Sequence, residues 1–194
     1  EGAGSASRGS WISEPVVQFL QPTQSPLIDI RIVFDTGAAV DDTKPGLANL
    51  TAAVLSRGGS SKRTYSEIQR ALFPMAASFS AQVDKEMTTF IGRVHKDHAE
   101  EYWKIVSGQL LDPGWRKQDF ERVRNNIVNE IRTDLRANND EELGKEVLYE
   151  AIYDGHPYGH LGLGHVAALE RMTVEDAKAH WQRHYGPRKV WLGL

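Results

Sequence analysis

The seven histidines are the residues of this sequence best suited to chemistry, because two histidines and a nearby carboxylate can hold zinc and activate its water. His95 and His98 lie three residues apart where a strand gives way to a helix, and we interpret them as exposed polar residues. His156 and His160 have the four-residue spacing of a zinc-binding helix. Pro157 and the adjacent glycines indicate a turn instead, in which the two rings do not align.

The other histidines and the remaining catalytic motifs add no site. His165, His180 and His184 are scattered without a carboxylate at ligand spacing, and we interpret them as surface or partly packed residues. The glycine-rich stretch 159–164 is not followed by the Lys-Ser/Thr pair of a phosphate-binding loop. There is no Gly-x-Ser-x-Gly motif, and without cysteine there is no thiol nucleophile and no disulfide scaffold. Spacing alone therefore assigns no active site.

Length and composition indicate a soluble globular protein. The chain has 194 residues, of which 40% are hydrophobic and 25% are charged. The net charge of −3 comes from well-mixed acids and bases, which excludes the basic surface of a nucleic-acid-binding protein. No apolar run approaches the roughly 18 residues that a membrane-spanning helix needs. We therefore expect no nucleic-acid partner, no membrane partner, and a location in either the cytoplasm or the periplasm.

The elements that must position a site follow from the periodicity of apolar residues. Residues 26–35 alternate between apolar and charged side chains, which predicts a strand with Ile30, Ile32 and Phe34 on one face. Similar patterns predict strands at 15–20, 76–84, 86–94 and 188–194, and helices at 46–56, 65–73, 98–110, 117–136, 140–153, 165–170 and 174–185. This order predicts an α+β domain in which several helices cover one face of a mixed or antiparallel sheet.

Local signals refine three of these helices. Thr64 with Glu67 predicts a capping box, Asp97 with Glu100 predicts a second one, and Thr173 is the expected cap of helix 174–185. Helical spacing predicts that two helices bury an apolar stripe, which comprises Phe120, Val123, Ile127, Ile131 and Leu135 on one and Leu143, Val147, Leu148 and Ile152 on the other.

The two ends of the sequence differ from its middle. Residues 1–14 are small and polar and predict a flexible tail, so we expect the domain to occupy residues 15–194. The last seven residues, RKVWLGL, predict a strand without a following turn. We therefore expect the chain to be part of a longer protein.

In its organisation the chain resembles the N-terminal domain of the M16 family of zinc metallopeptidases, which includes pitrilysin, insulin-degrading enzyme and the mitochondrial processing peptidase. The strand and acidic loop FDTGAAVDD precede KPGLANLTAAVLSRGG, which resembles the family's zinc-binding helix. The segment QDFERVRNNIVNEIR resembles the helix that carries the third zinc ligand. The segment from HPYGHLGLGH to the final strand resembles the family's His-Pro-Tyr-Gly loop, the helix after it and its Tyr-x-Pro turn. The resemblance extends over about residues 26–194, and it is the order and spacing of these segments that make it specific.

The resemblance also implies where zinc chemistry would lie. Active members carry the inverted motif His-x-x-Glu-His, in which the two histidines bind zinc and the glutamate is the general base. The matching residues are Asn49, Ala52 and Ala53, of which the two alanines have no donor atom and no proton acceptor. The third-ligand position retains a carboxylate, Glu130, while the second acidic position of that helix is Val123. One carboxylate does not make a zinc site, so we expect no metal and no catalysis in this chain.

Three functions remain open at this point. The first is an inactive domain or subunit that pairs with an active zinc peptidase domain or subunit, which supplies the zinc, around a chamber for peptides. The second is an active metallopeptidase with unconventional ligands, drawn from His95, His98 or His156 with Glu130. The third is a protein-binding scaffold unrelated to proteolysis. For Glu130 itself, a plain polar residue and a structural role near Asn49 are both open.

Overall fold

Strand β1 (Leu27–Phe34) lies inside the sheet, and its alternating sequence explains its position. Ile30, Ile32 and Phe34 are buried against the helices, whereas Asp29 faces away and pairs with Arg93. The strand order is β2 (Ser78–Val83), β3 (Thr88–His95), β1 and β4 (Val190–Gly193), and every neighbouring pair is antiparallel. The predicted α+β class is confirmed, with an antiparallel sheet.

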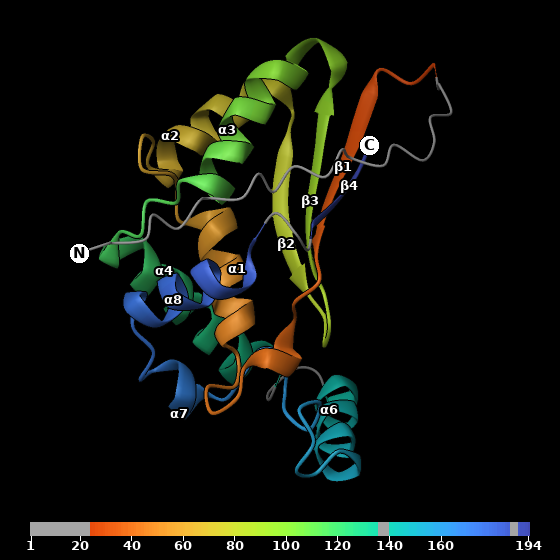
Figure 1. Ribbon diagram of the computed structural model, residues 1–194, viewed down its shortest axis with the longest axis vertical. Coiled ribbons are helices and arrows are strands. Elements are labelled where there is room, and N and C mark those ends of the chain that lie inside the picture. The colour runs from red at the N-terminus through yellow and green to blue at the C-terminus, as the bar shows by residue number, and fades with distance from the viewer. Residues whose placement is uncertain (1–23, 136–139, 187–189) are drawn as a thin grey trace, which may run out of the picture.

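The computed structural model describes residues 24–135, 140–186 and 190–194, and Figure 1 shows its helices on one side of the sheet. The predicted tail and the predicted strand at 15–20 lie outside the described residues. The helices are α1 (Leu47–Arg57), α2 (Tyr65–Leu72), α3 (Ala99–Leu111), α4 (Lys117–Asn129), α6 (Asp140–Ile152), α7 (Val166–Leu169) and α8 (Val174–His184). Short turns of helix are η1 (Ala38–Val40), η2 (Phe73–Met75) and η3 (Lys96–His98), and the π-helical segment η4 (Glu130–Leu135) follows α4. None of the described helices is both long and apolar enough to cross a membrane.

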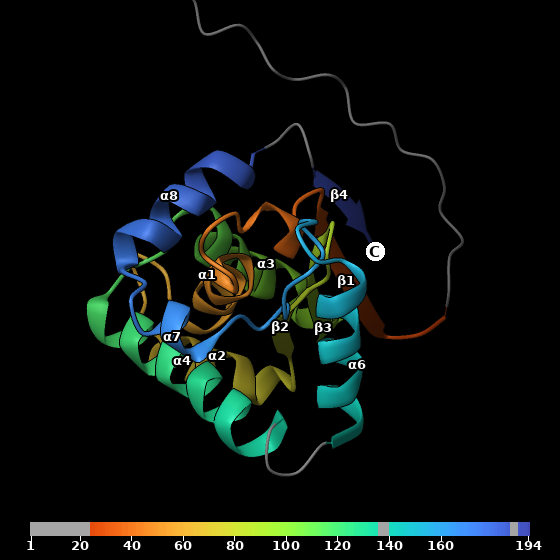
Figure 2. The ribbon, with the colours of Figure 1, turned by 90° about the horizontal axis from the view of Figure 1, so that it is seen from below.

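Helix α1 is the centre of the molecule, and Figure 2 shows it surrounded by α3, α4, α7, α8 and the sheet. One side of α1 packs into a sheet-side core with β1, β3, α2 and α3. Its other side packs into a helix-side core with α4, α7 and the start of α8. Because two cores share this helix, nine of its eleven residues are buried.

The capping box predicted at Thr64 and the cap predicted at Thr173 are confirmed. Thr64 accepts from the Glu67 backbone at 3.3 Å and donates its own backbone N–H to the Glu67 carboxylate at 2.7 Å. Thr173 forms the equivalent pair with Asp176. These reciprocal bonds satisfy backbone donors at the first turns of α2 and α8.

The capping box predicted at Asp97 is wrong. Asp97 lies inside η3, and α3 begins at Ala99 after an N-cap residue, His98, that makes no side-chain cap bond. The backbone N–H of Asp97 donates to His95 Nδ1 at 3.3 Å instead. Glu100 pairs with Lys104 one turn later at 2.7 Å. The extra 3₁₀ turn therefore moves the helix start beyond the reach of the Asp97 side chain.

Two predictions about helices need correction. The regular helix expected at 117–136 ends at Asn129, although Phe120, Val123, Ile127 and Ile131 are buried as predicted. The side chain of Leu135 lies outside the described part, as does that of Leu143.

The second correction concerns α6, which was expected to bury its apolar stripe. Val147, Leu148 and Ile152 are instead exposed over 56%, 58% and 64% of their surface. Leu148 and Ile152, four residues apart, share one side of the helix, and that side faces solvent.

Candidate functional site

The start of α1 is fixed by a buried carboxylate, Asp41. Its two oxygens accept the backbone N–H groups of Gly46 and Ala48, each at 2.7 Å, which satisfies donors that a helix N-terminus leaves free. The Asp41 side chain is fully buried, and His160 Nε2 lies 3.2 Å from one of its oxygens. Asp41 therefore links the start of α1 to the loop that contains His160.

That loop packs tightly against α1. Gly46 has a φ of +96°, and a Cβ added to it would lie 2.6 Å from the carbonyl oxygen of Leu163. Lys85 Nζ donates to the carbonyl oxygen of His160 at 2.5 Å, and the Tyr158 hydroxyl donates to Glu86 in the same β2–β3 turn. The His-Pro-Tyr-Gly loop thus fastens the helix start to the end of the hairpin.

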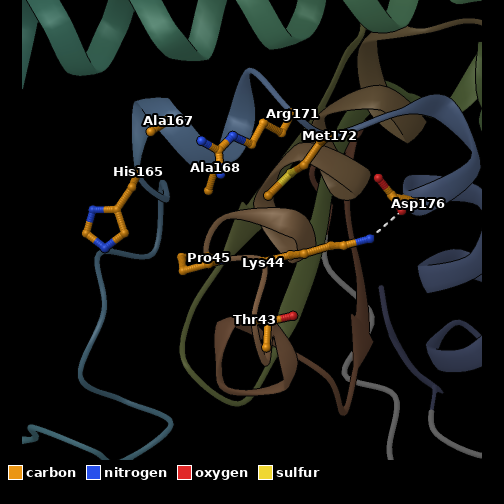
Figure 3. Close-up of a pocket in the computed structure, with 9 residues that line it drawn as sticks. All are labelled: Thr43, Lys44, Pro45, His165, Ala167, Ala168, Arg171, Met172 and Asp176. Carbon is orange, nitrogen blue, oxygen red and sulfur yellow. Dashed lines mark hydrogen bonds and ion pairs between the residues drawn. The ribbon is translucent and has the colours of Figure 1, made fainter.

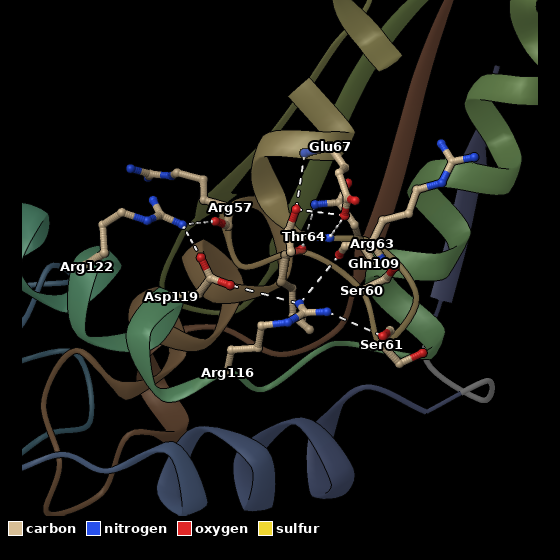
Figure 4. A network of polar contacts seen from close by, with 11 residues as sticks. Arg57, Ser60, Ser61, Arg63, Thr64, Glu67, Gln109, Arg116, Asp119 and Arg122 are labelled. Carbon is tan, nitrogen blue, oxygen red and sulfur yellow. Dashed lines mark hydrogen bonds and ion pairs between the residues drawn. The ribbon is translucent and has the colours of Figure 1, made fainter. Parts of the chain in front are cut away.

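The C-terminal end of α1 is held by side chains from two other helices (Figure 4). Gln109 of α3 donates Nε2 to the carbonyl oxygens of Leu55 at 3.3 Å and Ser56 at 3.0 Å. Arg122 of α4 donates to the carbonyl oxygen of Arg57 at 2.6 Å and also binds Asp119 at 2.9 Å. With partners at both ends, α1 has a fixed position in the fold.

The residues that we expect at the family's zinc-motif positions, Asn49, Ala52 and Ala53, lie on this central helix. Thr51, a poor residue for a helix interior, is fully buried and donates its hydroxyl to the carbonyl oxygen of Leu47 at 2.7 Å. Ala52 lies in the sheet-side core with 0% exposure, and Ala53 lies in the helix-side core with 3%. Asn49 is half-buried at the first ligand position. The general-base and second-ligand positions are therefore packed against other side chains.

Glu130 occupies the junction between α4 and the π-helical segment η4. Its side chain is exposed, and its backbone N–H is shared between the carbonyl oxygens of Asn126 and Ile127. Ile127 and Ile131, on either side of Glu130, belong to the same core as Ala53. Helix α1 and the helix that leads to Glu130, which together we call the frame of the expected zinc site, therefore pack together. π-Helical turns are rare and are frequent at functional sites, which makes this position notable although its carboxylate faces solvent.

Zinc does not fit this set of donors. A catalytic zinc site uses about three protein ligands and one open position. The frame offers one exposed carboxylate, one amide and two buried methyl groups. Across residues 24–135, 140–186 and 190–194 there is no group of three His, Asp or Glu side chains arranged to hold a metal.

The histidines outside the frame form separate pairs: the ring centroids of His95 and His98 are 6.4 Å apart, and those of His180 and His184 are 4.6 Å apart. His98 and His156 are exposed, and His165 Nε2 lies 3.4 Å from Glu150. His180 was interpreted as a surface or partly packed residue, and this is wrong, because it is 95% buried where α8 crosses the sheet-side core. Burial, followed by the nearby charge of His184, lowers the pKa of His180 to about 4. Its Nε2 has no hydrogen-bond partner within the described residues.

A pocket of about 400 Å³ lies beside the start of α1, between residues 43–45 and the α7–α8 segment (Figure 3). Lys44 reaches Asp176 with an Nζ–Oδ1 distance of 2.5 Å. Burial raises the pKa of Asp176, but the bonds from Lys44 and Thr173 outweigh burial, and the net pKa is lowered. Lys44 and Asp176 therefore neutralise each other, and His165 and Arg171 are the other charged or titratable side chains that line the pocket.

Sequence reasoning missed Asp41, the contact of His160 with Asp41, and the close contact between Gly46 and Gly164. The signals were present, because an acid lies just before the Pro-Gly start of the helix and glycines recur in 159–164. What the sequence lacks is any indication that these two segments touch.

Comparison with known proteins identifies the family to which the chain belongs. The family description "insulinase (peptidase family M16)" matches residues 18–164, well over half of the chain. The chain belongs to peptidase family M16. An uncharacterized zinc protease of Rickettsia felis is 21% identical over 136 residues, which cover 70% of this chain and 32% of that protein.

Solved structures share the M16 fold. A crystal structure of a peptidase M16 inactive domain from Pseudomonas fluorescens superposes with a TM-score of 0.81 at 23% identity and covers 89% of this chain and 42% of that one. A protease from Helicobacter pylori gives a TM-score of 0.75 at 15% identity, with coverage of 88% and 41%. The chain thus spans about a third of the length of the curated relative and about two fifths of each solved chain.

Proposed function

We propose that residues 15–194 form a non-catalytic M16 domain that pairs with an active zinc peptidase domain or subunit. In this proposal the partner supplies the zinc, and this chain forms one wall of a chamber that binds peptides. The observation that carries the proposal is the burial of Ala52 and Ala53, the residues that we expect at the positions of the general base and the second zinc ligand. The Pseudomonas fluorescens structure, which is described as an inactive domain, supports the same interpretation.

Strand β2 is the proposed contact for the peptide. It lies at one edge of the described sheet and pairs only with β3. Edge strands usually avoid unwanted pairing through charges or proline, but β2 reads SFSAQV and carries neither. Helix α1 packs against β2, so a peptide added to this edge would pass beside the degenerate motif.

Metal analysis and a peptidase assay test the absence of catalysis. We expect the purified chain to contain much less than one zinc per molecule and to cleave no fluorogenic peptide, with or without a chelator. Glu130→Gln is the matched control, because it removes the one carboxylate that the frame retains. Stoichiometric zinc that is lost in Glu130→Gln, or chelator-sensitive cleavage by this chain alone, would refute the proposal and favour an enzyme with unconventional ligands.

Reconstitution tests the pairing. The chain is used to capture proteins from its source, and each captured protein is assayed for zinc and for peptide cleavage with and without added chain. The proposal expects a zinc peptidase whose turnover rises when this chain is present. Capture of proteins that contain no zinc and cleave no peptide would instead indicate a scaffold unrelated to proteolysis.

Backbone chemistry tests the β2 contact. A labelled peptide that binds as an added strand should lose affinity when alternate backbone nitrogens are methylated, because each methyl group removes one ladder hydrogen bond. Unchanged fluorescence anisotropy titrations would rule out strand addition and leave the pairing proposal to its own test.

A further inference from the structure

The pocket beside the start of α1 has the size of a ligand site. Its volume of about 400 Å³ lies within the roughly 300–1,000 Å³ that such sites occupy. One wall is the segment 43–45 that leads into α1, and the opposite wall is α7 together with the residues that connect it to α8 (Figure 3). Segments far apart in the sequence therefore meet around this pocket.

Four charged or titratable side chains line the pocket, and three of them have partners. Lys44 pairs with Asp176 at 2.5 Å, and His165 Nε2 lies 3.4 Å from Glu150. Arg171 is the fourth side chain. It is exposed, and its guanidinium makes no hydrogen bond or ion pair with any residue that the structure describes. The pocket therefore presents one positive charge that the protein does not compensate.

The remaining surface of the pocket is mostly apolar. Met172, which is buried with 3% exposure, forms the floor, and Pro45 belongs to the opposite wall (Figure 3). Ala167 and Ala168 add two methyl groups on the same wall as Arg171. A ligand that fits this pocket must therefore carry an anionic group next to an apolar body.

The single free guanidinium favours a carboxylate over a phosphate group. A guanidinium binds a carboxylate through two parallel N–H···O bonds, and one arginine matches the charge of one carboxylate. A phosphate monoester carries up to about two negative charges and three acceptor oxygens. The second cation that such a group needs is absent from the described part of the pocket, because Lys44 is neutralised by Asp176. The pocket therefore matches an organic monocarboxylate.

We propose that this pocket binds the C-terminal residue of a peptide. The terminal carboxylate accepts two N–H groups of Arg171, and an apolar side chain such as that of leucine covers Met172 and Pro45. Since Arg171 is exposed and Met172 is buried, the side chain points inward and the rest of the peptide leaves toward solvent. Capture of a C-terminal carboxylate is a recurring mode of peptide recognition.

This inference goes beyond the proposed function and does not rest on it. Every peptide cleavage creates a new C-terminal carboxylate, so the ligand is one that the proposed zinc peptidase partner would release. The pocket itself is built by this chain alone and requires neither the chamber nor the β2 contact. Binding to the isolated chain can therefore fail while the pairing holds, and the pairing can fail while binding holds.

Two labelled peptides with the same sequence test the ligand. Both carry a fluorophore at the N-terminus and end in leucine, but one has a free carboxylate and the control has a C-terminal amide. In anisotropy titrations of this chain alone at low salt, we expect the free acid to bind at least about tenfold more tightly, because the amide loses the charged pair with Arg171. The difference should shrink as salt is added. Equal affinity for the two peptides at low salt would overturn the proposal.

Variants of Arg171 locate the site. Arg171→Gln should remove the preference for the free acid, and Arg171→Lys should retain only part of it, because lysine keeps the charge but not the fork of two donors. Lys178→Gln is the matched control, since Lys178 is an exposed residue of α8 that does not line the pocket. A preference that survives Arg171→Gln, or that Lys178→Gln reduces equally, would overturn the assignment.

A second pair of variants does not alter Arg171. Ala167→Glu should weaken binding of the free acid by about tenfold or more, because it adds a negative charge to the wall that carries Arg171. Ala167→Gln, which adds nearly the same volume without a charge, should change the affinity less than about threefold. Equal effects of the two substitutions would show that the free carboxylate does not lie in this pocket.

Competition identifies which part of the ligand is recognised. Acetyl-leucine should displace the free-acid peptide at a concentration at least about tenfold lower than acetate does, because acetate has no apolar side chain to bury. Acetate as effective as acetyl-leucine would overturn the contact with Met172 and Pro45. Inorganic phosphate that displaces the peptide at a lower concentration than acetyl-leucine would overturn the choice of a carboxylate.

Discussion

The burial of Ala52 predicts a specific penalty when the family's general base is reintroduced there. Ala52→Glu places a carboxyl group at a position with 0% exposure. Fully buried glutamates reach pKa values of about 8–9, against about 4.3 in an unfolded chain. Because the pKa is raised in the folded state, only the unfolded state ionises between these values, and the free energy of unfolding falls as pH rises. At about 1.36 kcal/mol per unit, the loss is about 1 kcal/mol at pH 5 and about 5 kcal/mol at pH 8.

Urea unfolding followed by circular dichroism at the two pH values measures this loss. Ala52→Gln is the control, because it has nearly the same size and does not ionise. Both variants share an overpacking cost of about 1–3 kcal/mol, so the difference between them isolates the charge. Compared with Ala52→Gln, we expect Ala52→Glu to lose about 4 kcal/mol more between pH 5 and pH 8, a large part of the ~5–15 kcal/mol that holds a typical domain folded.

The outcome that would refute this reasoning is equal behaviour of the two variants at both pH values. A glutamate that costs no more than a glutamine would have to reach water. Position 52 would then face an open site, and the packing of α1 would no longer support the proposed absence of zinc chemistry.

Three further predictions use the same unfolding assay. Gly46→Ala should lower the free energy of unfolding by at least about 1–2 kcal/mol, because φ is +96° and a Cβ would lie close to Leu163. The control Gly144→Ala, which has open space around it, should raise the free energy of unfolding by about 0.5–1 kcal/mol. Equal effects of the two substitutions would refute the close contact at Gly46. Because the pKa of His180 is lowered to about 4, its contribution to stability is complete above about pH 6.5 and is lost toward pH 4. Relative to His180→Gln, the wild type should lose about 3 kcal/mol of unfolding free energy between pH 6.5 and pH 4. Parallel plots of unfolding free energy against pH for the two proteins would contradict the burial of His180. Thr173→Ala should cost about 1 kcal/mol by removing the cap of α8, and a neutral effect would count against that cap.

Sequence reasoning succeeded where one segment determines its own structure. The alternation in β1 and the Thr-Glu spacing at the start of α2 depend only on local geometry, and both are confirmed. It failed where the burial of a side chain depends on which distant segment packs against it. Periodicity places Leu148 and Ile152 on one side of α6, but the direction of that side depends on how the helix docks. His180 gives no local sign of burial, since its environment comes from elements distant in the chain.

For the candidate site as well, the sequence could predict which helices are involved but not how their side chains are packed. Motif order predicts that Asn49, Ala52 and Ala53 take the zinc-motif positions, and the structure shows these residues on a single helix that packs beside α4, which Glu130 follows. The spacing of residues could not show that Ala52 and Ala53 are enclosed by two different cores, because each core is built from several distant segments. Nor could it show that the Glu130 side chain is exposed at a π-helical turn, since helical periodicity predicts a regular helix there.

These packing facts suggest why chemistry is hard to restore in α1. A zinc-binding helix must leave its ligand side open to a cavity, whereas methyl groups let α1 approach β2 on one side and α4 on the other. Larger donors at positions 52 and 53 would need both neighbours to move apart, and both ends of α1 are held by Asp41, Gln109 and Arg122. Since protein interiors deform little, the helix cannot shift to make room. In the proposed non-catalytic domain, the absence of ligands at positions 52 and 53 and the close packing of α1 are therefore one structural state, and introducing ligands there requires undoing that packing.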